Sequence, residues 1–443
     1  MKFLYADTQD FVDADFDFAE ERYSAGRDKN HTDVYAHELM SEPPYDGLLV
    51  SISAVRQAPG VPKSKVRYST AQEQRMLRDG VRRYLRFGGP RFKDMMIMGD
   101  CGAFAYANLV RPPFTPQEVF DFYDEAEFTH GVAPDHIIFD CDLNDPKIPK
   151  APEQLAGLEA DRHVTGVQER YQITLDNAKR FFEIAKANEF PFVPVGPVQG
   201  WSPASMAQAA QSLEAMGYRY LAIGGMVPLK VPAIKAVVRA IRDRIKPETQ
   251  LHILGFAKAD SIDEFTNFGI TSFDSTSPLI RAFKDAKANY YLEQPNGKMA
   301  YYTAIRVPQT LGSHRLMRGI KEGLYKPEEL ANLEAKALEA LRGFDSGHKT
   351  AKSTAQAVMA YHRAIETPLY SDEAKRELKL EATSHAVEET LDAAPWKRCE
   401  CDICRKVGVE VIIFRSNNHN RRRGFHNLGA YHRHVQRTLR QSS

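Results

Sequence analysis

Short hydrophobic runs recur along the first part of the chain, and each is followed by a stretch in which apolar residues return every three or four positions. The runs are rich in β-branched and aromatic residues and predict strands, whereas the stretches between them predict amphipathic helices. The eight expected strands cover residues 1–7, 45–53, 95–100, 136–142, 191–196, 219–225, 251–256 and 270–274. This alternation is typical of an α/β protein, and eight strands predict a (β/α)8 TIM barrel.

The ends of two expected helices are marked by capping residues. Thr115 and Pro116 take the N-cap and the first helical position of one helix, and Gly217 closes the helix in residues 202–217. A doubly wound sheet is the alternative fold, but it should carry a glycine-rich phosphate loop after its first strand. Neither G-x-G-x-x-G nor G-x-x-x-x-G-K-[ST] occurs in the chain, so the barrel is preferred.

After the eighth strand the pattern changes to long amphipathic helices. Helical spacing is clear in residues 326–343 and 354–366 and resumes after Ser371. The end of the chain combines clustered cysteines with many arginines. We therefore expect three parts: a barrel in residues 1–290, a helical insertion in 291–394, and a zinc-binding subdomain with a basic C-terminal helix in 395–443.

Three of the five cysteines lie close together, at Cys399, Cys401 and Cys404. Thiols at this spacing cannot all pair with one another, whereas a C-x-C-x₂-C run is a strong metal-binding pattern. With one histidine they would form a closed tetrahedral site, which is typical of structural zinc. Spacing alone leaves the fourth ligand open among four histidines, namely His419, His426, His432 and His434.

The net charge of +1 is unevenly distributed along the chain. From Arg415 to Ser443 there are seven arginines and no acidic residue. A basic segment of this kind can contact the phosphates of a nucleic acid, and the alternative is a solvated surface or part of a metal site.

Nothing in the composition indicates a secreted or membrane protein. The first residues lack the basic and apolar regions of a signal peptide, and no run approaches the roughly 20 apolar residues of a membrane helix. Five cysteines, three of them clustered, do not form a secreted disulfide framework. We expect a cytoplasmic protein without a membrane partner.

Polar residues and glycines gather where the expected strands end. They are Asp100, Asp140, Asp142, Gln199, Gly224, Gly225 and Asp274. In a barrel of parallel strands the carboxyl ends meet at one face, which carries the catalytic residues. A single aspartate at such a place is more often a helix cap, but a whole set at successive strand ends predicts an active site.

These strand-end motifs resemble those of the tRNA-guanine transglycosylases. MGDCGAF at 98–104 is similar to that family's T-D-S-G-G-[FY], and IIFDCD is similar to F-D-E-C. In the same order follow VQGW, AIGGM, ILGF and SFDST, which are similar to V-Q-G-G, A-I-G-G-L, M-G-V-G and M-F-D-C-V. The late CECDIC and FHN resemble the family's closing zinc motif, C-x-C-x₂-C with a following H-N.

The resemblance implies base exchange at an N-glycosidic bond and assigns a role to each matching residue. Asp274 matches the nucleophile that forms a covalent glycosyl-enzyme, and Asp100 matches the general acid/base. His426 matches the fourth zinc ligand. The remaining matches concern the base: Asp140, Gln199, Gly224 and Gly225 bind the guanine edge, and Phe104 and Leu254 stack on its faces.

Departures from the tRNA enzymes narrow the expected substrate. Cys101, Ala103 and Trp201 replace smaller or different residues beside the pocket, and Lys230 stands where bacterial tRNA enzymes have a glutamate facing an aminomethyl group. A lysine opposes a cationic substituent but accepts a neutral nitrile, which favours 7-cyano-7-deazaguanine (preQ0) as the incoming base. The long helical insertion before the cysteines resembles DNA-guanine transglycosylases, which place 7-deazaguanine bases in DNA.

DNA is therefore the expected polymer, and we expect Arg421, Arg422 and Arg423 to bind its phosphates. Without an ATP-binding motif, any energy for opening DNA would come from an accessory protein. Two alternatives stay open at this point. One is a tRNA-guanine transglycosylase of unusual sequence, and the other is a non-catalytic nucleic-acid-binding protein with a zinc module.

Overall fold

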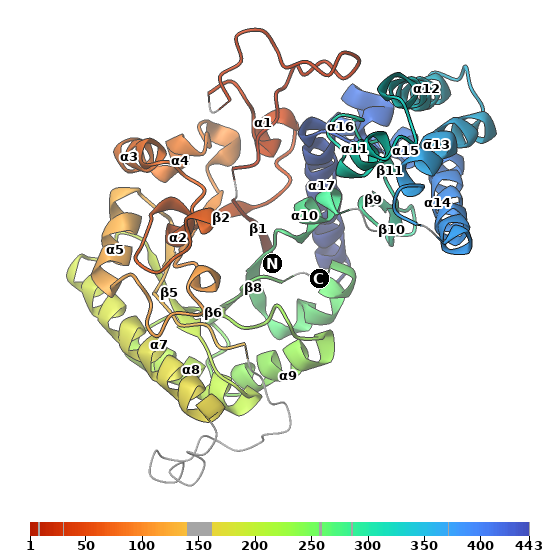
Figure 1. Cartoon of the computed structure of the whole chain (residues 1–443). Helices are drawn as coiled ribbons and strands as arrows, with labels where there is room; N and C mark the ends of the chain where they lie inside the picture. Colours follow the sequence, from red (N-terminus) through yellow and green to blue (C-terminus); the bar gives the residue numbers. More distant parts are fainter. Residues whose placement is uncertain are drawn as a thin grey trace. The chain divides into compact units, whose positions relative to one another are not determined.

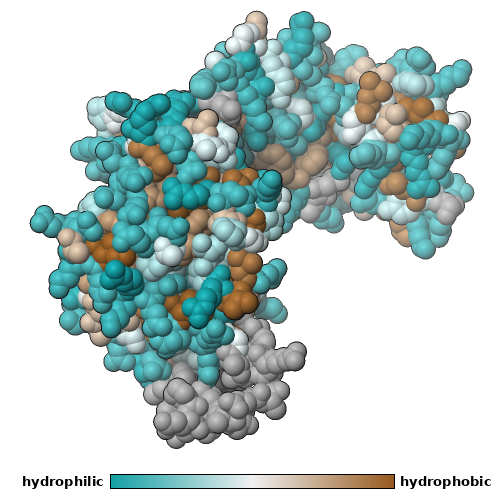
Figure 2. Space-filling view, turned by 60° about the vertical axis from the view of Figure 1, so that its left-hand side comes forward, coloured by the Kyte–Doolittle hydropathy of each residue, from teal (hydrophilic) through white to brown (hydrophobic). Residues whose placement is uncertain are grey.

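The chain folds into two compact units, shown in a computed structural model that describes residues 1–7, 9–29, 31–139, 162–256, 259–284, 287–370 and 372–442 (Figure 1). The first, here called the barrel unit, comprises Met1–Gln9, Tyr45–Thr276 and Thr438–Ser443. The second unit comprises Asp10–Pro44 and Ser277–Arg437. Among the described helices, none is both long and apolar enough to cross a membrane. Figure 2 shows a mostly hydrophilic surface on which hydrophobic residues form small patches.

The barrel unit is built on a closed sheet of parallel strands that pair in chain order, and this confirms the predicted TIM-type barrel. Its strands are β1 (Lys2–Ala6), β2 (Gly47–Ser51), β3 (Met96–Asp100), β4 (His130–Val132), β5 (Val193–Val198), β6 (Tyr220–Ile223), β7 (Gln250–Ile253) and β8 (Ile270–Asp274). The barrel closes where β1 pairs with β8, with Leu4 opposite Asp274. A buried apolar layer fills its interior, made of Leu4, Leu49, Met96, Met98, Val132, Val195, Tyr220 and Ala222.

Helices follow the strands and return the chain to the amino end of the sheet. They are α2 (Ile52–Val55), α3 (Thr70–Asp79), α4 (Val81–Tyr84), α5 (Pro116–Glu125), α7 (Arg162–Ala187), α8 (Pro203–Met216) and α9 (Val231–Arg242), with short 3-10 turns at Lys63–Lys65, Pro90–Phe92, Ala103–Ala105 and Ala259–Phe268. The predicted caps are present: the Thr115 side chain accepts from the Glu118 backbone at 3.3 Å, and Gly217 adopts φ +120°.

The fourth strand was predicted too late in the sequence. Strand β4 lies at His130–Val132, where it pairs with β3 and β5, whereas residues 136–139 lie outside the ladder. The strand contains Gly131, which weakens the hydrophobic signal, and the buried Ile137 and Ile138 pack without strand pairing. Asp140 and Asp142 lie outside the described residues.

The second unit combines the long helices with small sheets and contains the three clustered cysteines. Its elements are α1 (Ala36–Leu39), α10 (Ser277–Phe283), β9 (Tyr290–Glu293), β10 (Met299–Tyr302), β11 (Ile305–Arg306), α11 (His314–Lys321), α12 (Pro327–Asp345), α13 (Ala351–Glu366), α14 (Glu373–Ala393), α15 (Pro395–Arg398), α16 (Asp402–Val407), the 3-10 turn Gly408–Val411, β12 (Ile413–Phe414) and α17 (Asn417–Ser442), whose last residues belong to the barrel unit. Strands β9 and β10 form an antiparallel hairpin, and β11 pairs with β12.

Two expectations about this region need correction. The stretch predicted as a helical insertion begins with strands β9 to β11, and helix α12 runs through the expected stop at Gly343 to Asp345. The N-terminal segment Asp10–Pro44 also belongs here, where the Ser41 hydroxyl donates to Asp402 at 2.8 Å. The division into three parts, 1–290, 291–394 and 395–443, stays a prediction.

Two glycines allow helix α5 to approach the sheet. The buried ring of Tyr123, on α5, lies where a side chain at Gly99 on β3 or at Gly131 on β4 would stand. A methyl group at Gly99 would come within 2.2 Å of the Tyr123 ring, and one at Gly131 within 2.5 Å. The Tyr123 hydroxyl donates to the Val132 carbonyl at 3.2 Å, which fixes the ring against β4.

We predict that Gly99→Ala lowers the free energy of unfolding by about 1–3 kcal/mol, because the extra methyl overpacks a closed site. Gly88→Ala is the matched control, since Gly88 has open space around its Cα and no left-handed backbone angle. Urea denaturation of both variants measures the difference. Equal stability of the two variants would show that Tyr123 can move away at no cost.

Candidate active site and metal site

Asp274 ends strand β8 and is held through one carboxylate oxygen. Its Oδ1 accepts hydrogen bonds from the Gly255 backbone N–H at 2.8 Å and from His252 Nε2 at 3.2 Å. No described residue donates to Oδ2. The side chain is largely buried, with the residue 7% exposed, so the carboxylate has one anchored oxygen and one that can act on a bound molecule.

A line of hydrogen bonds continues from Asp274 across the sheet. His252 Nδ1 lies 2.6 Å from the Ser272 hydroxyl, and that hydroxyl lies 2.5 Å from the hydroxyl of Tyr220. Because the carboxylate can only accept, His252 donates from Nε2. In the neutral imidazole Nδ1 then accepts from the Ser272 hydroxyl, and Ser272 in turn accepts from Tyr220. The register of β7 and β8 places His252 directly opposite Ser272, and this brings the imidazole and the hydroxyl within hydrogen-bond distance.

Asp100 ends strand β3 and has a strongly perturbed acidity. Its Oδ2 accepts from the Ser51 hydroxyl at 2.8 Å and from the Gly102 backbone at 3.0 Å. Burial is the main cause that raises the pKa of Asp100 to about 7, the negative charges of Asp135 and Asp274 add to it, and the bonds from Ser51 and Gly102 oppose it. A carboxyl group with this pKa exchanges its proton near neutral pH and suits general acid/base catalysis.

Asp135 is a site residue that the sequence did not reveal. It is 2% exposed, and its two oxygens accept from the Cys101 thiol at 2.7 Å and from Gln199 Nε2 at 2.5 Å. Burial raises the pKa of Asp135, and these two hydrogen bonds oppose the rise. Asp135 stands just before residues 136–142, the range predicted as the fourth strand. A residue before a strand is expected at the amino end of the barrel, away from the catalytic face. The true position of β4 would have identified it.

Gln199 directly follows strand β5, is buried, and is bonded to the protein on both amide atoms. Besides donating to Asp135, it accepts from the Ile138 backbone at 3.1 Å. A methyl group at Gly224 would lie 2.1 Å from Gln199 Nε2, and one at Gly225 would lie 2.6 Å from the Ile138 carbonyl. The two glycines are therefore required by the packing of the protein itself, whatever they contribute to a ligand.

The two expected stacking residues differ in exposure. Phe104 is 53% exposed in the loop after β3, and its ring centroid lies 5.3 Å from that of Phe139. Leu254 follows β7, is half-buried and packs against the apolar layer of the barrel. Asp140, expected at the guanine edge, lies outside the described residues.

Three cysteines and one histidine form a compact group in the second unit. The ligand atoms of Cys399, Cys401, Cys404 and His426 all lie within 4.8 Å of one another. His426 Nδ1 is 3.6, 3.4 and 3.3 Å from the sulfur atoms of Cys399, Cys401 and Cys404. Bond lengths of about 2.3 Å to sulfur and 2.0–2.1 Å to nitrogen give an edge of about 3.5 Å in a zinc tetrahedron, so the donor set fits this metal.

The neighbours of His426 favour its role as a ligand. Its Nε2 lies 2.6 Å from the Tyr291 carbonyl, so Nε2 carries the proton and the lone pair of Nδ1 faces the sulfur atoms. The Tyr290 ring stacks on the imidazole at 4.1 Å. Of the other candidates, His419 is bonded to Glu410 at 2.9 Å and to Ser416 at 2.7 Å, away from the cysteines.

The prediction of phosphate binding is wrong for two of the three consecutive arginines. Arg422 and Arg423 are 1% and 0% exposed. Arg422 donates to the Asp13 carbonyl at 2.6 Å, and Arg423 donates to the carbonyls of Ala282 and Ile413 at 2.6 and 3.0 Å. Both side chains therefore point into the second unit, where they join distant segments of the chain. Arg421 is partly exposed and donates to the Phe11 carbonyl at 2.8 Å.

Comparison with known proteins identifies the family. No protein-family model matches the chain. The chain is 39% identical over 439 residues to a protein of Salmonella montevideo described as a DNA-guanine transglycosylase. The match covers 99% of this chain and 97% of that protein, so it extends over both units. This chain therefore belongs to the DNA-guanine transglycosylase family.

Proposed function

We propose that this protein replaces guanine in DNA by a 7-deazaguanine base through a covalent intermediate on Asp274. The observation that carries the proposal is the pair of carboxyl groups at the ends of β3 and β8. One is anchored with an open oxygen, and the pKa of the other, Asp100, is raised to about 7. Membership of the family supports DNA as the polymer.

The first half of the reaction breaks the N-glycosidic bond of a deoxyguanosine. Asp274 Oδ2 attacks C1′, a C1′–O bond forms and the C1′–N9 bond breaks, leaving its electron pair on guanine. Asp100 gives its proton to the departing base, which leaves as neutral guanine. The anchored Oδ1 keeps Oδ2 in place, because His252 and Gly255 hold it from one side.

The second half reverses these steps with the incoming base. Asp100, now a carboxylate, takes the N9 proton of the 7-deazaguanine, and N9 attacks C1′ while the bond to Asp274 breaks. Two displacements at the same carbon retain the configuration of the sugar. A pKa of about 7 suits both halves, since one group must donate a proton and then accept one.

Recognition of the base is proposed to involve residues around the carboxyl ends of the strands. Phe104 and Leu254 stack on the faces of the base, while Asp140, Gln199 and the backbone of Gly224 and Gly225 hold its edge. The exposure of Phe104 supports its part, because a ring that is half open to water gains from stacking.

The proposed incoming base is 7-cyano-7-deazaguanine. Lys230 is exposed at the N-cap of α9, in the loop that follows β6. A positive charge there disfavours a cationic aminomethyl group and tolerates a neutral nitrile. Exchange assays with labelled guanine on DNA and on tRNA separate this function from that of a tRNA enzyme, and exchange on neither polymer would indicate a non-catalytic binding protein.

We also propose that Cys399, Cys401, Cys404 and His426 hold a structural zinc ion. All four positions of a tetrahedron are filled by protein ligands, so the ion would cross-link α16 and α17 without binding substrate. Lone pairs from three thiolates and an imidazole are the donors that zinc prefers.

We predict that Asp274→Asn reduces guanine exchange by at least about 1000-fold, because an amide is not a nucleophile. The substitution is nearly isosteric, so thermal unfolding should stay close to wild type. Incorporation of labelled guanine into DNA measures the rate. Exchange within tenfold of wild type would remove Asp274 from the reaction.

The pH dependence follows from the raised pKa of Asp100. In a single turnover without acceptor base, guanine release needs protonated Asp100, so the rate should be constant below pH about 7 and fall about tenfold per unit above it. Asp135→Asn removes a charge that raises this pKa, so the fall should begin at lower pH. Asp100→Asn should be at least about 100-fold slower and lack the transition. An unchanged transition in Asp100→Asn would contradict the assignment.

Zinc content should depend on the four ligands and on no other cysteine. Cys401→Ser and His426→Ala should lose the metal, about one ion per chain, and lower the thermal stability of the second unit, because metal binding contributes to folding. Cys101→Ser and His419→Ala are controls that should retain the ion. Elemental analysis measures it, and zinc retained in His426→Ala but lost in His419→Ala would reassign the fourth ligand.

A further inference from the structure

Exposed basic residues gather in two loops at the carboxyl ends of the barrel strands. Lys63, Lys65 and Arg67 follow β2, and Arg111 follows β3. Within the described part of the chain, none of the four forms an ion pair. We call these four residues the basic rim. Charges without a carboxylate partner stay available for an anion from outside.

The two loops are folded against each other, so the rim charges have defined places. A methyl group at Gly60 would lie 2.8 Å from the Leu109 side chain, which shows how closely the loops approach. Gln57 Nε2 donates to the carbonyls of Ala58 and Val61 at 3.0 and 2.8 Å, and Val61 is buried.

The loop after β3 is fixed in the same way. The carbonyl of Leu109 lies 2.8 Å from His136 Nε2. Arg170, on α7, donates to the carbonyls of Ala107 and Ile137 at 2.8 Å each. Arg111 therefore extends from a loop that is anchored two residues earlier.

Aromatic rings lie on the same face as the rim. Phe104 and Phe139 are 53% and 38% exposed, and they follow β3 and β4. Exposed rings and unpaired cations at the same end of the barrel suit a nucleic-acid strand, because cations bind its phosphates and rings stack on its bases.

Acidic residues at the carboxyl ends of the barrel strands make nearby cations necessary for binding a polyanion. Asp100, Asp135 and Asp274 place carboxyl groups at this end of the sheet, and they repel a phosphate backbone.

We infer that the basic rim binds the phosphates of the DNA strand beside the exchanged guanine. This inference rests on the proposed function for the identity of the polymer. It places the DNA path over the loops after β2 and β3, with Phe104 and Phe139 facing the bases.

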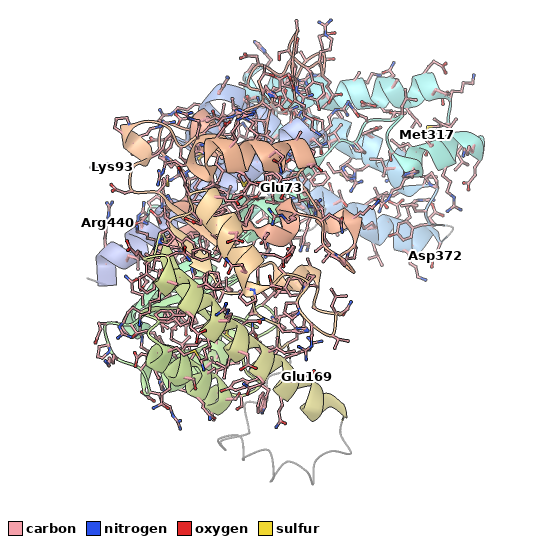
Figure 3. All side chains as sticks on the ribbon, turned by 90° about the vertical axis from the view of Figure 1, so that its left-hand side faces the viewer. Glu73, Lys93, Glu169, Met317, Asp372 and Arg440 are labelled. Carbon is pink, nitrogen blue, oxygen red and sulfur yellow. The ribbon has the colours of Figure 1, made fainter. Side chains whose placement is uncertain are left out.

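A variant with Lys63, Lys65, Arg67 and Arg111 all changed to Gln tests the inference. The control changes Arg83, Arg91, Lys93 and Lys186, four exposed cations at the amino end of the barrel, to Gln. In Figure 3, Lys93 lies at one end of the barrel unit and Glu169, near the start of α7, lies at the other. Both variants lose four positive charges. They differ only in the end of the barrel from which the charges are removed.

Binding of a fluorescein-labelled single-stranded oligonucleotide is measured at several salt concentrations. Each lost phosphate contact should lower the slope of log affinity against log salt by about 0.7, which is about fivefold in affinity at about 0.1 M salt. We expect the rim variant to lose at least two contacts, about 25-fold, and the control to match wild type. Lys63→Gln and Arg111→Gln alone should each lower the slope by about 0.7.

Guanine exchange at saturating DNA provides a separate readout. The rim variant should keep the wild-type maximal rate, because its residues do not touch the reacting atoms. Wild-type affinity and slope in the rim variant, or an equal loss in the control, would overturn the inference. A wild-type protein that binds DNA through the rim but exchanges no guanine would refute the proposed function and leave this surface intact.

Discussion

The hydrogen bonds on Oδ1 of Asp274 are the constraint from which the proposed chemistry follows. A free carboxylate rotates and presents either oxygen, but the Gly255 backbone and His252 hold this one in a single orientation. Ser272 and Tyr220 in turn fix the ring of His252 through a line of donors that ends in the apolar layer of the barrel. The pairing of β6, β7 and β8 therefore fixes the orientation of the Asp274 carboxylate and the position of its Oδ2.

Asp100 and Asp274 lie at the same face of the sheet but have different environments. Asp274 receives a backbone donor from Gly255 and an imidazole donor from His252, and both hold its Oδ1. Asp100 is half-buried. Desolvation of its carboxyl group and the negative charges of Asp135 and Asp274 raise its pKa to about 7. In the proposed mechanism, these two positions make a nucleophile and a proton donor from the same type of side chain.

The barrel could be predicted because its strands are short apolar runs whose ends carry polar residues, as at Asp100 and Asp274. The cysteine spacing indicated a candidate metal site, but it left the fourth ligand open among four histidines. The family resemblance pointed to His426, and the structure places this residue beside the three cysteines. Three-dimensional contacts account for the failures. Strand β4 contains a glycine that is needed against Tyr123, so its hydrophobic pattern is weak, and Asp135 was missed with it. Arg422 and Arg423 satisfy carbonyls from residues 13 and 282, which no local pattern reveals.

Detection of a covalent bond between DNA and Asp274 would test the proposed mechanism most directly. Incubation of the protein with a guanine-containing oligonucleotide, followed by denaturation before an acceptor base is added, should preserve the glycosyl-enzyme. Digestion and mass spectrometry should then find the sugar on the peptide that contains Asp274. An adduct on Asp100 or on any other residue, or guanine release without an adduct, would contradict the mechanism.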